Sequence, residues 1–224
     1  MTALDTGVLE CAPSLRLIPL SAEHVEPLSR AASLDRSTFD LAPVPRDHAE
    51  TQRYVASALS ELAAYRAVPY VVEHEGAIVG AYRLMSLEWW TWRDGPVHVA
   101  GDPRVCPSDA PDVVEIGHAW LVPSVQRTAV NTRVALRLME HAFDVWRVHR
   151  LVLKTDARNA RSRGAIERLG GQLEGIVRAH SPAADGVIRD VALYSILPAE
   201  WPQVRARGAA ARTRLEFGAR SGDT

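Results

Sequence analysis

Residues 113–155 constrain the fold more than any other part of the chain. They predict an apolar interior strand at 113–122, an amphipathic helix at 131–146 and a second strand at 151–155. A strand, a crossover helix and a parallel strand form a βαβ unit, whose connection is right-handed. The polar loop at 123–130 then opens the helix at the carboxyl end of the first strand. We therefore expect an α/β fold.

Further strands and helices are predicted on both sides of this unit from alternating and helical apolar spacing. The strands are expected at 15–20, 69–74, 77–84, 172–179 and 187–197, and the helices at 22–33, 46–67 and 159–169. Ser21 is a suitable cap for the first helix, and Pro69 is expected to end the second. These elements predict a mixed, mostly antiparallel sheet of about six to seven strands with helices on both faces.

Length and composition fit a single domain, because the chain has 224 residues, 47% hydrophobic and 24% charged. We expect this domain at 15–202, an N-terminal extension at 1–14 and an Arg- and Ala-rich tail at 203–224. Residues 87–112 form a long insertion that contains Trp89, Trp90 and Trp92. The tryptophans line a pocket or, as we favour, pack the insertion. The tail contacts nucleic acid or, as we favour, forms a solvated, fraying helix.

Charge and cysteine usage exclude several classes of partner. The 26 basic residues almost cancel the 27 acidic ones, so neither nucleic acid nor an anionic membrane surface is expected as a partner. Cys11 and Cys106 lack the paired spacing of a metal site. No apolar run is long enough to span a membrane, and the first residues lack a secretory signal. We therefore expect a cytoplasmic protein without a metal.

The loop that opens the central helix, residues 126–132 (QRTAVNT), predicts an anion site without glycines. It lacks the glycine signatures of Walker and dinucleotide-binding loops, which argues against a nucleotide phosphate site. Successive backbone N–H groups at a helix N-terminus nevertheless bind pyrophosphate when small side chains let the backbone approach. Asn131 and Thr132 are suitable caps, and Gln126 and Arg127 add donors. An ordinary capped helix is the alternative interpretation.

Three stretches together resemble the GNAT superfamily of N-acetyltransferases, in particular its ribosomal-protein-acetyltransferase-like (RimJ/RimL-type) branch. They are EIGHAWLVPSVQRTAVNT at 115–132, TDARNARSRGAIERLGGQLEG at 155–175 and DGVIRDVALYSIL at 185–197. With the N-terminal helices and the first hairpin, the resemblance covers residues 15–202. It implies a single GNAT-type domain with an acyl-CoA-binding βαβ core.

The resemblance also implies where coenzyme A binds. The family's pyrophosphate pattern, Gln/Arg-x-x-Gly-x-Gly/Ala, falls on 126–131, with Ala129 and Asn131 at the usual glycine positions. Its Asn-x-x-Ser pattern falls on Asn159 and Ser162, beside the pantetheine and the thioester sulfur. Main-chain amides at the end of a splayed strand supply the oxyanion donor. The residues expected to bind acetyl-CoA, or another short acyl-CoA, are Trp120, Leu121, Val122, Gln126, Arg127, Thr128, Ala129, Val130, Asn131, Thr132, Asn159 and Ser162.

Acyl transfer to an amine requires a group that removes a proton from the amine. Glu115 matches a strand glutamate often present in the branch and is the expected base, although a carboxylate that pairs at a strand start is the alternative. His118 and His180 are the other candidates. Strand alternation places His118 on the opposite face from Glu115, where a hydrogen-bonded core histidine is the simpler interpretation.

The departing thiolate must be protonated. Many relatives use a tyrosine at the position that Ile166 occupies here, so that route is closed. Ser162 is then the expected proton donor, and Tyr194 is the second choice.

The expected function is acyl-CoA-dependent N-acyltransfer, most simply of acetyl from acetyl-CoA to a primary amine of a protein N-terminus or small molecule. The alternative is a catalytically silent acyl-CoA-binding regulatory module. Acceptor pockets are built by variable loops, so the sequence does not identify the acceptor amine. It does not fix the oligomeric state either, for which a homodimer is one expectation.

Overall fold

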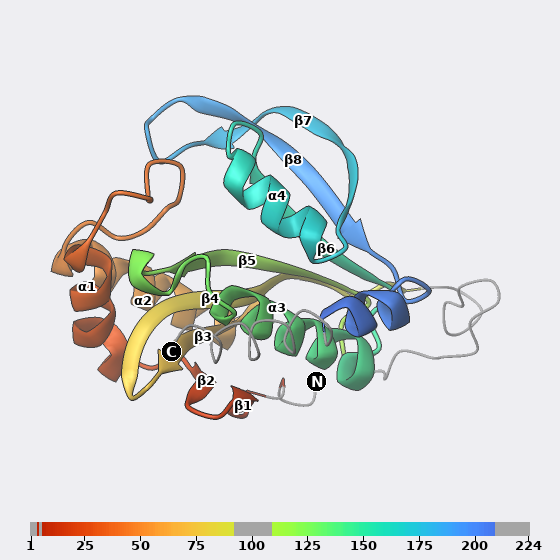
Figure 1. Cartoon of the computed structure of the whole chain (residues 1–224), viewed down its shortest axis with the longest axis horizontal. Coiled ribbons are helices and arrows are strands. Elements are labelled where there is room, and N and C mark those ends of the chain that lie inside the picture. Colours follow the sequence, from red (N-terminus) through yellow and green to blue (C-terminus); the bar gives the residue numbers. More distant parts are fainter. Residues whose placement is uncertain (1–3, 5, 92–108, 209–224) are drawn as a thin grey trace, which may run out of the picture.

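The computed structural model describes residue 4, residues 6–91 and residues 109–208. Within these ranges eight strands form one sheet, in the order β1-β2-β3-β4-β5-β6-β8-β7 (Figure 1). The strands are β1 (Leu9–Ala12), β2 (Leu15–Pro19), β3 (Ala67–His74), β4 (Ala77–Glu88), β5 (Val113–Leu121), β6 (Arg150–Asp156), β7 (Gln172–Pro182) and β8 (Ile188–Ile196). The helices are η1 (Ala22–His24), α1 (Val25–Leu34), α2 (His48–Ala63), η2 (Pro123–Val125), α3 (Val130–Glu140), η3 (His141–Trp146) and α4 (Ala160–Arg168).

The sheet is mixed and mostly antiparallel. β5 and β6 run parallel, and the other neighbouring strands run antiparallel. Because α3 connects β5 to β6, the predicted βαβ unit and the α/β fold are confirmed. The additional strand, β1, lies within the segment expected to be an N-terminal extension, and it pairs with β2.

Helices cover both faces of the sheet. Consecutive strand residues point to opposite faces. On β4 the Tyr82 hydroxyl donates to Asn131 of α3 (2.6 Å), whereas the Arg83 guanidinium donates to the carbonyl of Tyr54 on α2 (3.3 Å). α3 and α2 therefore lie on opposite faces, and Figure 1 shows α3 in front of the sheet and α2 behind it.

α4 lies on the same face as α3. Side chains of directly paired residues share a face. Leu84 shares the face of Tyr82, and the pairs Leu84–Ile116, Ile116–Leu153 and Leu153–Tyr194 carry that face across to β8. The Tyr194 hydroxyl donates to a carboxylate of α4 (2.9 Å). The helix α3 of the βαβ unit and the helix α4 that follows it thus lie on one side of the sheet.

β5 and β6 separate halfway along β5. Their parallel pairing ends at Ile116 and Leu153, whereas β5 stays paired with β4 as far as Leu121. The end of β5 therefore has an edge that β6 does not cover. This is the separation that the resemblance implies.

A β-bulge accompanies the separation. Arg83 pairs with Gly117 and Ala81 pairs with Trp120, so β5 uses one residue more than β4 over the same distance. His118 within this stretch has a φ of 47°, a left-handed conformation that is uncommon outside glycine.

The bulge changes the side to which His118 points. Glu115 pairs with Met85 and therefore points to the α2 face. The His118 ring lies 6.0 Å from the ring of Tyr54 on α2, so it points to that face as well. The prediction that Glu115 and His118 lie on opposite faces is therefore wrong, because strand alternation fails at a bulge.

Two helix ends differ from the sequence-based prediction. α2 ends at Ala63, and Tyr65 then takes a φ of 56°, so the chain leaves the helix before Pro69, which lies inside β3 opposite Arg83. The central helix begins at Val130 and passes into the π-helix η3 at His141.

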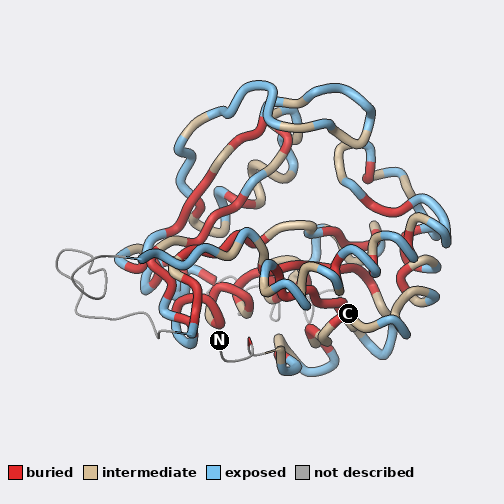
Figure 2. The backbone as a smooth tube through the Cα atoms, turned by 180° about the vertical axis from the view of Figure 1, so that it is seen from behind, coloured by how far each residue is buried: buried red, intermediate tan, exposed pale blue. Residues whose placement is uncertain are grey.

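Most of the long insertion, with Trp92 and Cys106, lies outside the described residues, as do residues 209–224 of the tail. Residues 201–208 form a helix that packs on the domain: Trp201 stacks on the ring of Phe143 (centroids 5.3 Å apart), and Val204 is buried. β7 is largely exposed along its length (Figure 2). None of the described helices is both long and apolar enough to span a bilayer.

Candidate functional site

A cavity of about 830 Å³ opens between the end of β5, α3, α4 and the helical residues 201–208. We call it the first cavity, and its volume is in the usual range for small-molecule sites. It is lined by Thr38, Phe39, Ala42, Tyr82, Ala119, Trp120, Leu121, Gln126, Arg127, Thr128, Asn131, Thr132, Leu136, Asn159, Ala160, Arg161, Ser162, Ala165, Arg168, Leu169, Val204, Arg207 and Gly208.

The first cavity is electropositive although the whole chain is nearly neutral. Arg127, Arg161, Arg168 and Arg207 are among its lining residues, and no Asp or Glu is. Arginine presents a planar fork of donors that suits phosphate oxygens. The cavity is therefore suited to a ligand that carries several negative charges.

The loop between β5 and α3 presents backbone to this cavity. Arg127 takes a φ of 62°, although it is not glycine. Gln126 before it is extended (φ −69°, ψ 152°), so the chain turns sharply at Arg127. α3 begins directly after this loop, and its N-cap residue, Ala129, has no side chain that could accept a hydrogen bond. The N–H of Val130 donates to Thr128 Oγ1 (3.2 Å), and the N-cap offers no acceptor to the N–H groups that follow, which lie at the positive end of the helix dipole.

The side chains of Gln126 and Thr128 hold this loop in place. Gln126 Nε2 donates to Thr38 Oγ1 and to the carbonyl of Leu121, both at 2.8 Å. Thr128 Oγ1 donates to the carbonyl of Val125 (2.6 Å). Gln126 therefore shapes the loop, and the exposed Arg127 is the loop's own cation.

Asn131 and Thr132 lie in the first turn of α3, because the helix begins at Val130. They do not cap it, contrary to the sequence-based interpretation. Asn131 Oδ1 instead accepts the hydrogen bond from Tyr82, which ties the start of α3 to β4.

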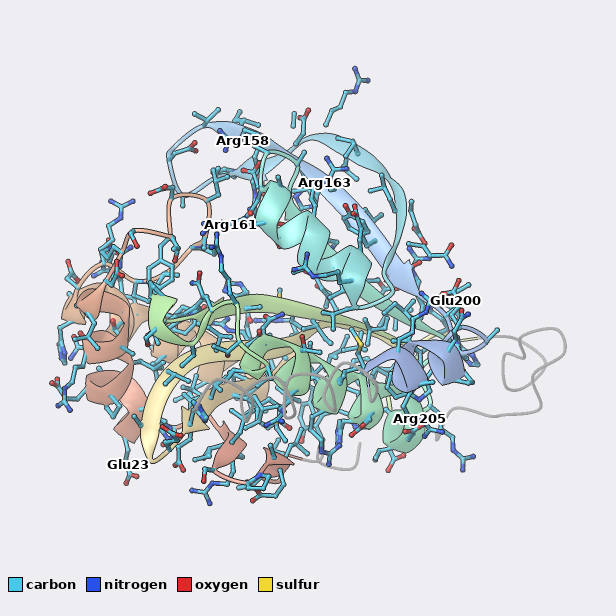
Figure 3. The ribbon with its side chains drawn as sticks, in the orientation of Figure 1. Glu23, Arg158, Arg161, Arg163, Glu200 and Arg205 are labelled. Carbon is cyan, nitrogen blue, oxygen red and sulfur yellow. The ribbon has the colours of Figure 1, made fainter. Side chains whose placement is uncertain are left out.

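Asn159 caps α4, as its residue type predicts: its Oδ1 accepts from the backbone N–H of Ser162 (3.0 Å). Ser162 lines the first cavity one turn into the helix. Arg161, beside the first turn of α4 in Figure 3, donates to the carbonyl of Thr38 (2.9 Å). Thr38, between α1 and α2, thus accepts hydrogen bonds from both α4 and the loop before α3.

Most of the predicted coenzyme A residues come together around the first cavity. Those that line it are Trp120, Leu121, Gln126, Arg127, Thr128, Asn131, Thr132, Asn159 and Ser162. Val122, Ala129 and Val130 do not line it; Val122 and Val130 are buried, and Ala129 is partly buried.

Glu115 lies on the other side of the sheet. Its carboxylate is 7% exposed and accepts from Lys154 Nζ (2.8 Å) and from Ser86 Oγ (3.0 Å). Lys154 is the chain's single lysine. Glu115 lies one residue before the point where β5 and β6 part, but it is not among the lining residues of the two cavities described here.

His118 lies close to Tyr54 and Arg83. Burial, together with the nearby Arg83 and Arg189 cations, lowers the pKa of His118 to about 4. His118 is therefore neutral at physiological pH.

The remaining catalytic candidates lie away from the first cavity. His180 is exposed on β7. The Tyr194 hydroxyl is fully engaged, because it accepts from Arg163 Nε (3.0 Å) and donates to Glu167 Oε1 (2.9 Å). Neither residue lines the cavities described here. Among the residues with described coordinates, no group of His, Cys, Asp or Glu has the arrangement of a metal site.

A second cavity, of about 680 Å³, lies between residues 36–46, the start of α2 and the β7–β8 turn. It is lined by Arg36, Phe39, Asp40, Ala42, Pro43, Val44, Pro45, Arg46, Glu50, Arg53, Tyr54, Ala183 and Ala184. Phe39 and Ala42 line both cavities, so the two are neighbours across this pair of side chains.

Sequence reasoning missed the residues that come from distant segments. Thr38 and Phe39 lie in a loop, Tyr82 on a central strand and Arg207 in the expected tail. No local pattern marks them, because their position depends on how the elements pack. Arg161 was accessible to sequence reasoning, since it lies within the Asn-x-x-Ser pattern at the start of α4.

Comparisons with known proteins agree with this geometry. A family model described as an acetyltransferase (GNAT) domain matches residues 14–172. A GCN5-related N-acetyltransferase from Brucella melitensis is 26% identical over 93% of this chain and 86% of its own, with a TM-score of 0.74. A putative acetyltransferase from T. thermophilus is 27% identical over 94% and 99%, with a TM-score of 0.71.

A Mycobacterium smegmatis RimJ structure in complex with CoA-disulfide is 20% identical over 88% of each chain, with a TM-score of 0.68, which shows a shared fold. A search of curated proteins found no match. The family model covers most of the chain, including the separated strands, the loop and α4. The chain therefore belongs to the GNAT acetyltransferase family.

Proposed function

We propose that the protein transfers acetyl from acetyl-CoA to a primary amine, on a protein N-terminus or a small molecule, by direct attack of the amine on the thioester. One observation carries the proposal: β5 and β6 part beyond Ile116 and Leu153, next to a cavity that reaches the start of α3. A thioester needs such a gap to meet main-chain donors, and a pyrophosphate needs a helix N-terminus.

The residues present fit coenzyme A. Residues 126–132 would hold the pyrophosphate, the segment from Trp120 to Val122 would lie along the pantetheine, and Asn159 and Ser162 would lie near the sulfur. The electropositive lining of the first cavity supports this assignment. The CoA-disulfide in the RimJ structure is consistent with it. When bound, acetyl-CoA supplies the activated acyl group.

Glu115 would receive the amine proton, directly or through water. Its carboxylate oxygen lies 2.8 Å from Lys154 Nζ, which holds the side chain in place on β5. Ser162 would donate a hydrogen bond or a proton to the departing thiolate. The acceptor would approach through the second cavity, which borders the first at Phe39. We also assign the chain to the ribosomal-protein-acetyltransferase-like branch, on the sequence blocks described above.

The test is release of free thiol from acetyl-CoA in the presence of butylamine, single amino acids or short peptides with a free α-amino group. We expect acceptor-dependent release, a drop of about 100-fold in kcat/KM for Glu115→Gln, and a drop of about 10-fold or more for Ser162→Ala. Glu23→Gln and Ser33→Ala are matched controls, since both residues are exposed and line neither cavity; Figure 3 shows Glu23 far from α4.

The outcomes separate the alternatives. Turnover that is unchanged in both variants would refute the catalytic assignments while leaving the activity in place. Thermal stabilisation by acetyl-CoA without turnover on any acceptor would instead indicate the silent binding module.

A further inference from the structure

Three buried polar atoms near the bulge make no hydrogen bond of normal geometry with the described residues, although the Tyr54 hydroxyl lies near the polar groups of Arg83 and Trp120. They are the Tyr54 hydroxyl, His118 Nδ1 and Trp120 Nε1. Buried polar atoms in folded proteins are nearly always paired, so a group of unpaired ones calls for an explanation. A bound substrate or water would satisfy all three.

Tyr54 and Trp120 lie on the wall between the two cavities, and His118, which lines neither cavity itself, lies behind this wall beside Tyr54. Tyr54 lines the second cavity and Trp120 lines the first. The rings of Tyr54 and His118 are 6.0 Å apart, and Trp120 packs edge-on against Phe39 (5.9 Å), which lines both cavities. A molecule that passes from the second cavity to the first therefore meets Tyr54 before it reaches Trp120.

We infer that Tyr54 and His118 bind the attacking amine in its neutral form at this wall, an inference that rests on the proposed function. An amine that attacks a carbonyl carbon points its lone pair at that carbon. A primary amine then has two N–H groups to satisfy. The Tyr54 oxygen can accept one of them, and His118 Nδ1 can accept the other when the ring proton is on Nε2. Trp120 Nε1 remains as a donor for the tyrosine oxygen or the thioester oxygen.

The charges around the group favour a neutral amine. His118 has no positive charge at physiological pH and so keeps an acceptor lone pair. The Arg83 guanidinium, 2% exposed, lies 4.4 Å over the Tyr54 ring and pairs with Glu61 (3.3 Å). A buried cation raises the free energy of an ammonium ion placed beside it. The site therefore selects for amines that have lost their proton.

The arrangement also distinguishes classes of acceptor. A secondary amine has one N–H and leaves one of the two acceptors unpaired, at a cost comparable to a lost hydrogen bond. The inferred site is thus specific for primary amines.

Thiol-release kinetics with butylamine, N-methylbutylamine and a tetrapeptide with a free α-amino group test the inference. Tyr54→Phe should raise KM for the primary amine about 10-fold, since one hydrogen bond is lost. It should also reduce the preference for butylamine over N-methylbutylamine. Tyr65→Phe, which follows α2 and lines neither cavity, is the matched control. Tyr82→Phe should alter acetyl-CoA affinity instead, because its hydroxyl holds α3.

A second pair of variants addresses His118. Asparagine keeps an acceptor near Nδ1 and tolerates the left-handed backbone, so His118→Asn should retain most of the amine affinity, whereas His118→Leu should lose it. Thermal melts with acetyl-CoA confirm that each variant is folded and binds the cofactor.

The inference is overturned if Tyr54→Phe and His118→Leu leave KM and the amine preference unchanged, which would mean that water alone occupies the site. If the unmodified protein shows no amine-dependent turnover, the proposed function fails and the inference fails with it. An effect on KM for the amine at unchanged acetyl-CoA affinity supports both.

Discussion

His118 combines two features that are costly for a folded chain, a left-handed backbone and a partly buried imidazole whose Nδ1 is shielded from solvent. The His118 ring contacts the Tyr54 ring, but Nδ1 has no hydrogen-bond partner among the described residues that would offset the cost of burying it. Residues held in such conformations concentrate at functional sites. At the scale of single residues, His118 is therefore the position where the needs of folding and of the proposed chemistry diverge most.

The lowered pKa of His118 predicts a pH-dependent stability. Its folded-state pKa, about 4, is below the ordinary value of 6.5, so the unfolded chain binds more protons between these pH values. The contribution is fully present above pH 6.5 and is lost as pH falls through 4, with a limit of about 3 kcal/mol. Urea unfolding at pH 7.5 and 4.5 should show a smaller loss for His118→Asn than for the unmodified protein. An equal loss in both proteins would contradict the assignment.

Single-residue roles could be predicted where they depend on neighbours in sequence. Asn159 caps α4 through a residue three positions away, and a sequence pattern captures that distance. Tyr54 could not be found in this way, because its importance arises from a bulge on a strand more than fifty residues later and from the packing of α2 over it. Glu115 was found by its motif, but its partners Lys154 and Ser86 depend on strand register.

At the scale of elements, the close approach of β4 to the end of β5 depends on Gly80. A Cβ at this position would lie 2.1 Å from the Trp120 carbonyl oxygen, a backbone atom that cannot move without shifting the strand. Gly80→Ala should therefore destabilise the protein by about 2 kcal/mol or more, which lowers Tm by about 4–8 °C. It should also weaken acetyl-CoA binding, because Trp120 lines the first cavity.

Gly175→Ala on β7 is the matched control for this prediction. Nothing lies within 4 Å of a Cβ there, so its Tm should stay within about 2 °C of the unmodified protein. Similar melting temperatures for the two variants would show that the close approach of β4 and β5 is not needed for stability.

Helices and strands could be predicted from the sequence where the apolar pattern was long, and could not where it was short. β5, α3 and β6 were predicted in type and order, because apolar patterns over about ten residues are distinctive. β1 has four residues and no period to detect, and it is stable through its pairing with β2. Pro69 was expected to stop a helix, but its lack of an N–H is also compatible with its place in β3, where its carbonyl accepts from Leu20 (3.0 Å).

At the scale of the whole molecule, acetyl-CoA in the first cavity would contact segments that are far apart in the sequence. The first cavity is bounded by α3, α4 and residues 201–208, so a ligand there contacts three separate segments. Binding to the folded state at 100 times Kd should add about 2.7 kcal/mol and raise Tm by about 5–10 °C. Scanning calorimetry against acetyl-CoA concentration measures this, with ATP as the comparison ligand. A larger shift with ATP would favour the rejected nucleotide site.

The packing of distant segments against one another was the hardest feature to predict from the sequence. The α/β fold and the parallel pair follow from element order. The position of the helical residues 201–208 at the first cavity could not be predicted in this way, because an Arg- and Ala-rich stretch is typical of a solvated helix. Val204 is buried against Gly170. A Cβ at position 170 would lie 2.6 Å from Val204 Cγ2, so a side chain there would push Val204 away.

The bulge in β5 inserts one residue, so that Glu115 and Trp120 share a face although they are five positions apart. Deleting His118 would give β5 and β4 equal numbers of steps, and Glu115 and Trp120 would keep the faces they now occupy. A chain that lacks His118 could therefore keep the same pairing of β4 with β5, without a bulge. Such a deletion would remove the imidazole of the inferred amine site and leave the strand pairing in place.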